Sequence, residues 1–518
     1  MPMSLTQSIA CACAVWSSFI FAVQAIGIIQ LFRYYSKPPR RATLETQAVY
    51  TDDPSASSAP PSQTSAVPYV TVIRPVKGLE AGLYECLAST FRQTYPRDRL
   101  SLCLCVESRA DPSFPVLEQV LADFALCGVS ARIYVEDEDP LLHGAAGSTD
   151  TLGPNPKIRN ISRAYRDAPA DGLVWIIDCN VWVAPGVAGR MVQKLVGSAT
   201  ETPYKFVHQL PLVVDISAPS SSLIPGDGAA LDEMFMATTH AKFYSAINTV
   251  GIAPCIVGKS NMFRKAHLDR LTDPVQNPTV LTVRDANRGR GVDFFSSYIC
   301  EDHLIGDLLW RSPLPGFRNH GLVTGDLAIQ PMNDDVSVHS YAARRVRWLR
   351  VRKWTVLLAT LVEPGVESLL CAAYASFAWA NLAAPSPTVL AFVKCWLAIV
   401  GVWMTADWFT YRRLHSCDSV AQDDNTPLFA QQKQAYRKLG PWIRAWLGRE
   451  MLALPIWTYA VLLGATVDWR GRPFRVRMDM SVERVGGDDP AEAQLLTGSR
   501  SGSTDGTRAS TPSKARVD

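Results

Sequence analysis

Hydrophobic positions in the first third of the chain alternate between two patterns. Short apolar runs, which predict buried strands, occur at residues 69–73, 100–106, 132–135 and 173–177. Apolar residues at helical spacing lie between them and predict helices at residues 79–91 and 114–126 and a helix start at 157–164. This alternation predicts an α/β fold with a mostly parallel sheet, whose ligand site lies beyond the carboxyl ends of the strands.

Near the N-terminus, a longer apolar stretch predicts a membrane-spanning helix. Ser8 to Phe32 carries no charge and is long enough to cross a bilayer. Arg33, Lys37, Arg40 and Arg41 follow it. Because basic residues favour the cytosolic side, the domain that follows is expected to face the cytosol.

The C-terminal third contains further apolar segments. Residues 366–383 and 388–409 are predicted to form a hairpin of two spans, and residues 354–362 are expected to lie in the membrane interface. Residues 451–467 are short and contain Pro455. Four arginines follow them, so a full crossing would oppose the charge rule, and we expect a re-entrant or partial insertion.

Composition then divides the chain of 518 residues. We expect an N-terminal anchor at 1–35, a flexible linker at 36–68, a catalytic domain at 69–353, membrane-embedded and interfacial segments at 354–478 and a disordered tail at 479–518. Residues 215–231 are expected to form a surface insertion. The net charge of +3 gives no reason to expect nucleic-acid binding. Twelve cysteines without a CxxC pair fit small buried side chains in a reducing compartment.

Polar residues at the strand ends suggest chemistry. Asp178 and Asn180 follow the fourth strand, where oxygen ligands could hold Mg²⁺ or Mn²⁺ on a diphosphate. Glu107 and Asp111 follow the second strand and could contact a nucleoside. Both pairs are also ordinary turn residues, so neither is decisive alone.

Two later motifs complete the pattern. Glu301 and Asp302 open a predicted helix, where a carboxylate could deprotonate an acceptor hydroxyl or simply cap the helix. Arg344-x-x-Arg347-Trp348 lies in a basic cluster that could grip a departing diphosphate at a membrane surface, or only contact anionic lipid. His208 is either a site residue or a core histidine, and His303 is expected to be structural. The combination is typical of a membrane-bound sugar transferase with a nucleotide-sugar donor.

The order of these motifs along the chain resembles that of the ceramide glucosyltransferase family. The chain looks like a fungal-type member of that family. Asp178, Asp302 and Arg344-x-x-Arg347-Trp348 match its spaced acidic residues and (Q/R)xxRW motif. Residues 155–160, 207–211 and 469–477 are also similar, and the resemblance covers about residues 69–477. Ser108 stands where the family has its first acidic residue, so the residue that contacts the nucleoside stays open between Glu107 and Asp111.

The resemblance implies a GT-A-type domain that transfers glucose from UDP-glucose to the primary hydroxyl of ceramide with inversion. It implies that Asp178, with Asn180, holds the divalent cation and that Asp302 is the general base. Arg344, Arg347 and Trp348 would stabilise the diphosphate, and Lys157 would lie near the nucleotide. It also implies a multi-pass protein of the Golgi membrane or the endoplasmic reticulum with a cytosolic catalytic domain.

Three alternatives share some of these signals. A processive polysaccharide synthase would use the same motifs but needs a channel for its polymer. A dolichyl-phosphate sugar transferase would use a phosphate acceptor and needs no base such as Asp302. An inactive membrane scaffold has only the Ser108 departure in its favour.

Overall fold

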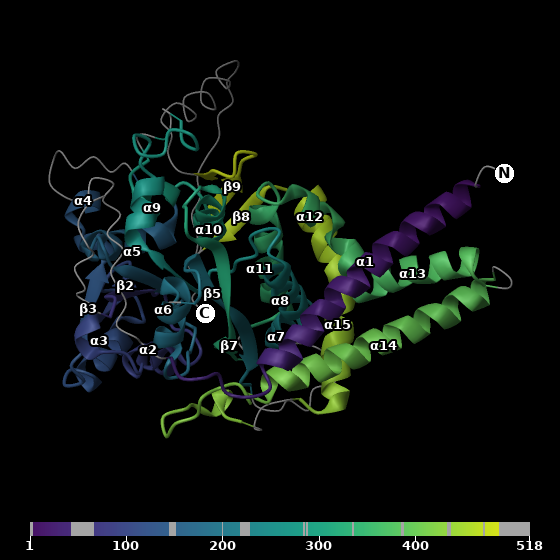
Figure 1. The fold of residues 1–518 in the computed structure, drawn as a ribbon, viewed down its shortest axis with the longest axis horizontal. Helices are drawn as coiled ribbons and strands as arrows, with labels where there is room; N and C mark the ends of the chain where they lie inside the picture. Colours follow the sequence, from purple (N-terminus) through teal and green to yellow (C-terminus); the bar gives the residue numbers. More distant parts are fainter. Residues whose placement is uncertain are drawn as a thin grey trace, which may run out of the picture.

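The computed structural model describes residues 4–42, 67–143, 152–198, 200–217, 228–282, 285, 288–333, 336–384, 388–432, 437–469 and 472–485. Its centre is a seven-stranded sheet in the order β3-β2-β1-β4-β6-β5-β7. The strands are β1 Val70–Pro75, β2 Leu100–Val106, β3 Ser130–Val135, β4 Leu173–Ile177, β5 Tyr204–Asp215, β6 Ser260–Arg264 and β7 Arg318–Met332. Figure 1 shows this sheet on the side of the molecule away from the long helices.

One strand of this sheet runs against the others. β1 pairs in parallel with β2 and β4, β2 with β3, and β5 with β7. β6 pairs antiparallel with both β4 and β5. Because β6 is reversed, its amino end lies at the edge where its neighbours have their carboxyl ends, which brings a new segment to the ligand-binding edge.

Helices cover both faces of the sheet, as expected when a parallel sheet is buried on two sides. On one face, α2, α3 and α6 contribute to a hydrophobic core, and α5, α9 and α10 pack on the other. Their bounds are α2 Leu83–Phe91, α3 Phe114–Asp123, α5 Pro156–Asp167, α6 Val187–Val196, α9 Lys265–Leu271 and α10 Glu301–Arg311, with the short α4 at Pro140–His143.

The remaining helices join the catalytic domain to the membrane part. They are α1 Leu5–Tyr34, α7 Gly228–Phe235, α8 Ala241–Val250, α11 Val338–Arg352, α12 Leu357–Val362, α13 Ser368–Leu382, α14 Val389–His415 and α15 Leu439–Leu462. In Figure 1, α1, α13 and α14 extend together away from the sheet. A second, three-stranded sheet consists of β8 Thr466–Trp469, β9 Arg472–Val476 and β10 Val482–Arg484.

Two helices in the described part of the chain are long and apolar enough to cross a membrane, α1 and α14. The segment Leu357–Val366 and α13 together form a third candidate, bent by 73°. Most of the apolar window of α14 is exposed, as expected for a surface that faces lipid. The predicted α/β fold with N-terminal and C-terminal membrane helices is therefore confirmed.

The predicted strands and helices of the first third agree with the structure. β2 and β4 have the expected bounds, and β1 and β3 differ from theirs by one or two residues. β2 is buried along almost its whole length, as its continuous apolar sequence indicates. Asn155 begins α5 by accepting hydrogen bonds from the backbone of Lys157 and Ile158, which fixes this helix next to the strand ends.

Two boundaries differ from expectation, and a third prediction falls mostly outside the described residues. Of the predicted surface insertion at 215–231, Asp215 ends β5 and residues 228–231 begin the buried helix α7, while residues 218–227 lie outside the described residues. The predicted tail begins too early, because residues 482–484 form β10, and residues 486–518 lie outside the described residues. Most of the predicted linker, residues 43–66, also lies outside them.

The apolar segment predicted at 451–467 also has other bounds in the structure. It belongs to a longer helix, α15, which begins at Leu439, and Val467 already lies in β8. The small sheet then packs against the catalytic domain, since Arg472 contacts Glu107 and the Val482 N–H donates to the Ser297 carbonyl. Arg472, Arg475 and Arg477 therefore lie on the same side as the seven-stranded sheet.

Candidate active site

Asp178 forms the centre of a charge cluster at the end of β4. The Lys157 Nζ lies 3.2 Å from its Oδ1, and the Lys259 Nζ lies 3.1 Å from its Oδ2. Lys259 is also 3.4 Å from the amide oxygen of Asn180. The backbone N–H of Asp178 donates to the Lys259 carbonyl, so the reversed strand β6 fixes this lysine opposite the end of β4.

The two ammonium groups hold Asp178 in its charged form. Burial raises the pKa of this carboxyl, but Lys157 and Lys259 outweigh it and lower the pKa to about 2. Burial likewise opposes the charge on Lys157, yet nearby carboxylates raise its pKa. Asp178 and Lys157 therefore stay ionised at neutral pH.

Glu301 and Asp302 open α10, as the sequence predicts, but their surroundings differ. The Glu301 Oε1 lies 3.0 Å from the Lys157 Nζ, and its Oε2 accepts a hydrogen bond of 3.2 Å from Asn155. Asp302 is half-buried, and among the described residues no ion pair reaches its carboxylate. Glu301 is therefore committed to holding the site together, whereas Asp302 is available to a substrate.

Close packing puts Asp302 against the loop before β6. A Cβ atom added to Gly258 would lie only 2.7 Å from the Asp302 Oδ2, so a larger residue at this position would displace the Asp302 side chain. Burial raises the pKa of Asp302, and Lys157 opposes this effect. Asp178 also raises this pKa, which places the two carboxyl groups close enough to influence each other. A raised pKa suits a carboxylate that must accept a proton.

The arginine motif on α11 surrounds a buried carboxylate. The Arg344 Nη1 lies 2.9 Å from the Asp232 Oδ2, and Asp232 on α7 is fully buried. Burial raises the pKa of Asp232, while Arg344, Arg345, Lys259 and Arg347 oppose it. Asp232 therefore pairs directly with the motif through Arg344 and is influenced electrostatically by Lys259 of the strand-end cluster.

Arg345 and Trp348 of the same helix pack on Phe235 of α7. The Arg345 guanidinium stacks 3.6 Å over the ring of Phe235, and the ring of Trp348 lies 6.4 Å from that ring. Arg345 also pairs with Glu363 at 3.2 Å. Consecutive arginines thus face two different surroundings: Arg344 faces the site, and Arg345 faces the helices beside the membrane.

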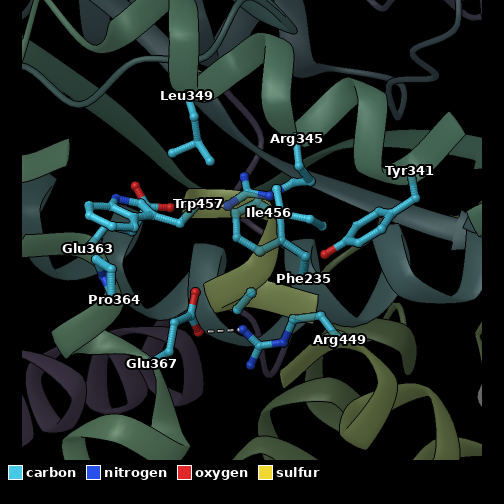
Figure 2. A pocket seen from close by; sticks show the side chains of 11 residues that line it. Phe235, Tyr341, Arg345, Leu349, Glu363, Pro364, Glu367, Arg449, Ile456 and Trp457 are labelled. Atoms are coloured by element: carbon cyan, nitrogen blue, oxygen red, sulfur yellow. Dashed lines mark hydrogen bonds and ion pairs between the residues drawn. The ribbon is translucent and has the colours of Figure 1, made fainter. Parts of the chain in front are cut away.

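A small cavity lies beside Arg345 (Figure 2). Figure 2 shows Arg345 and Tyr341 of α11 above it and the ion pair between Glu367 and Arg449 below it. The remaining lining is Glu363 and a mostly apolar set, Phe235, Leu349, Pro364, Ala453, Ile456 and Trp457. The lining therefore combines ion pairs with apolar side chains.

Both carboxylates that were predicted to contact the nucleoside interact with other residues of the protein. Glu107 pairs with Lys77 at 2.7 Å and with Arg472 of β9 at 2.5 Å. Asp111 accepts hydrogen bonds from the backbone of Gly78 and Ser113, as turn residues commonly do. Glu107 thus lies among cations at the strand edge, whereas Asp111 shapes the loop before α3.

His208 belongs to the core. It is fully buried in β5, and its Nδ1 contacts the Tyr244 hydroxyl. Burial lowers its pKa well below the usual range, so it stays neutral. The core interpretation is therefore the better one. His303 is half-buried beside the acidic pair on α10.

Asp178 and Asn180 are suitable ligands for Mg²⁺ or Mn²⁺. The contacts of both side chains with Lys259 place a carboxylate and an amide oxygen around one point. No group of three or more His, Cys, Asp or Glu side chains in the described ranges could hold a metal by itself. The residues therefore fit an ion that takes its remaining ligands from a diphosphate and water, as Mg²⁺ commonly does.

Sequence reasoning missed Lys259 and Asp232. Lys259 lies in an unremarkable Gly-Lys-Ser stretch, and its role depends on the reversal of β6. Asp232 follows the poorly patterned segment at 215–231, but an acidic residue within an apolar run is a signal that could have been used.

Comparison with known proteins identifies the family of this chain. The family model described as glycosyl transferase family 21 matches residues 40–272 and 281–482. A protein of Pyricularia oryzae named ceramide glucosyltransferase is 58% identical over 494 residues, covering 93% of this chain and 96% of the relative. A protein of the same name from Komagataella phaffii is 35% identical and covers 93% of each chain.

Among solved structures, a mannosyltransferase from Pyrobaculum calidifontis in complex with GDP-Man and Mn²⁺ covers 79% of this chain and 97% of its own. The two sequences are 16% identical, and the TM-score of the superposition is 0.39. The family model and the curated relatives, which extend over most of the chain, establish the family. The chain belongs to glycosyl transferase family 21, and its predicted resemblance to ceramide glucosyltransferases is confirmed.

Proposed function

We propose that this enzyme transfers glucose from UDP-glucose to the primary hydroxyl of ceramide, with inversion at the sugar carbon. The observation that supports this most directly is the grouping of Asp178, Asp302 and the arginine motif around one strand edge of a membrane-anchored domain of this family. The relatives named ceramide glucosyltransferase support the choice of sugar and acceptor.

The donor binds at the carboxyl edge of the sheet, where cations are concentrated. Lys157 and Lys259 offer ammonium groups to the diphosphate, and Glu107 follows β2, which is separated from β4 by β1, on the side to which the nucleoside would extend. Asp178 and Asn180 hold the divalent cation. When bound, this cation neutralises charge on the diphosphate and so makes it a better leaving group.

Asp302 acts as the general base. As the acceptor oxygen attacks the anomeric carbon, its proton passes to the Asp302 carboxylate, and the bond between that carbon and the diphosphate oxygen breaks. Attack from the face opposite the diphosphate inverts the configuration. Glu301 is a poorer candidate, because Lys157 and Asn155 already occupy its oxygens.

Arg344 and Arg347 stabilise the departing UDP, and Trp348 shapes the acceptor side of the site. Arginine suits the first task because its guanidinium donates two parallel hydrogen bonds to phosphate oxygens. Asp232 holds Arg344 in place through an ion pair that is buried on its carboxylate side.

The acceptor approaches from the membrane. α12 exposes Leu357, Leu358 and Leu361, as an interfacial helix would, and the cavity of Figure 2 lies between α11, α15 and the segment after α12. Ceramide carries hydroxyl and amide groups next to its chains, which match the charged and apolar lining of that cavity. We place the protein in the Golgi membrane or the endoplasmic reticulum with its catalytic domain in the cytosol.

Neither alternative transferase is favoured by the comparisons, because the relatives that match most of the chain are named ceramide glucosyltransferases. The arrangement around Asp302 also differs from what a phosphate acceptor requires. Such an acceptor is already ionised and needs no buried carboxylate base.

The experiment is a membrane-fraction assay with labelled UDP-glucose and a short-chain ceramide, run for the native chain and for Asp302→Asn. We expect a chloroform-soluble glucosylated lipid that falls by about 10²- to 10⁴-fold in the variant, the usual contribution of a general base. UDP binding should be retained in the variant. Label in insoluble polymer only, or a variant with near-native rate, would contradict the acceptor or the base respectively.

A further inference from the structure

Lys259 has a position that maintenance of the fold does not explain. The register of β6 on β4 is already set by backbone pairing, including Ser260 with Ile177 and the Asp178 N–H to the Lys259 carbonyl. The ammonium group adds nothing to that pairing. Its side chain instead extends along the ligand edge, 13% exposed, to the oxygens of Asp178 and Asn180.

Those oxygens are the ones that would hold the divalent cation. Both oxygens of Asp178 face a lysine, Lys157 on one side and Lys259 on the other, so one negative charge is shared by two positive ones. A free dication that approached this point would meet two ammonium groups at close range, and like charges repel strongly where water is partly excluded. A diphosphate would instead be attracted by the same groups.

We propose that Lys259 is a donor-binding residue that, with Lys157, keeps free divalent cations from Asp178 until the nucleotide diphosphate arrives. This rests on the proposed function, since it assigns a step to the same site. When the diphosphate enters, the Lys259 ammonium moves from Asp178 to a phosphate oxygen. Asp178 and Asn180 then become available to the cation, so the cation and the diphosphate bind together.

Asp232 makes this transfer possible without leaving the lysine uncompensated. Lys259 lies close enough to Asp232 to favour ionisation of that buried carboxyl, and Arg344 pairs with the same carboxyl. Besides Asp178, Lys259 therefore has a second carboxylate in its electrostatic surroundings, and it can leave Asp178 while it keeps a favourable electrostatic environment.

The test uses the purified full chain in detergent micelles. UDP binding is measured by calorimetry in the presence of a chelator, and Mn²⁺ binding by electron paramagnetic resonance with and without UDP. Lys259→Met is compared with Lys194→Met, which removes a lysine that lies over the ring of Tyr204, away from the site. Thermal unfolding of each variant serves as the folding control.

We expect the two ligands to respond in opposite directions. Lys259→Met should weaken the binding of UDP by about 10- to 100-fold, which is the effect of losing one hydrogen bond to a charged group. The same variant should bind Mn²⁺ more tightly than the native chain when UDP is absent. Lys194→Met should change neither affinity, and Lys259→Arg should retain most of the UDP affinity.

The native chain alone also tests the idea, should the methionine variant fail to fold. If it takes up Mn²⁺ equally well with and without UDP, the exclusion of free cations is wrong. Unchanged UDP affinity in a folded Lys259→Met protein would overturn the donor-binding role. A native chain that binds no UDP even when Mn²⁺ is present would instead contradict the proposed function itself, so the two failures are distinguishable.

Discussion

Two charge clusters of this molecule are built from similar residues but have different surroundings. At the strand edge, Lys157, Asp178 and Lys259 have side chains that are 11%, 25% and 13% exposed. Beside the membrane helices, Lys242 of α8 pairs with Asp407 of α14, and both side chains are almost completely buried. Asp407 also accepts a hydrogen bond of 2.9 Å from Trp446.

The difference in exposure distinguishes an ion pair that can bind a ligand from one that only stabilises the fold. A cluster that solvent can reach, with two cations on one carboxylate, can exchange a protein partner for a ligand. A fully buried pair cannot, because separating it leaves a charge without water or partner. Ion pairs between distant segments are therefore not equivalent, and exposure indicates which of them a ligand can use.

The largest effect is expected at the buried pair. Asp407→Asn leaves the Lys242 ammonium without its counter-charge and should lower the free energy of unfolding by about 3–5 kcal/mol. Thermal unfolding in detergent would show this as a large fall in the midpoint temperature. The double variant Lys242→Met with Asp407→Asn should recover most of the loss, whereas Lys259→Met at the strand edge should change the midpoint little. An Asp407→Asn protein as stable as the native chain would break the comparison.

Asp232 combines features of both clusters. Its side chain is fully buried, as in the Lys242–Asp407 pair, but its partner Arg344 is only half-buried. Asp232→Asn retains the shape of the side chain but removes the charge that holds the guanidinium. We expect kcat to fall by about 10- to 100-fold, the range for hydrogen bonds to charged groups, with a smaller change in KM for ceramide. Steady-state kinetics at saturating UDP-glucose measure this. A variant with normal kcat and only lower stability would show that Asp232, like Asp407, only stabilises the fold.

The smallest expected effect is a shift in pH dependence. The rate should fall as pH decreases through the pKa of Asp302, which burial raises above its usual value, and not through that of Asp178, which is about 2. Lys157 favours the ionised form of Asp302, so removing it raises this pKa further. The acid limb of kcat in Lys157→Met should therefore lie at higher pH than in the native chain. A limb that moves to lower pH, or stays in place, would contradict the base assignment.

Sequence patterns were most informative where structure depends on neighbouring residues. The first four strands, the opening of α10 at Glu301 and the α1 helix follow from local periodicity and charge. Patterns failed where long-range pairing decides the outcome. β10 joins β9 only after the chain has returned to the catalytic domain, and Arg472 reaches Glu107 from 365 residues away.

The sequence by itself determined the α/β order, the membrane anchor and the motif residues Asp178, Asp302 and Arg344-x-x-Arg347-Trp348. Hydrophobic spacing and residue chemistry are local properties that can be read in order along the chain. Only the tertiary structure decided which cations face Asp178, because the reversal of β6 brings Lys259 to an edge that its sequence neighbourhood does not indicate. It also decided the different surroundings of Glu301 and Asp302, since Lys157 and Asn155 contact the first and, among the described residues, no ion pair reaches the second.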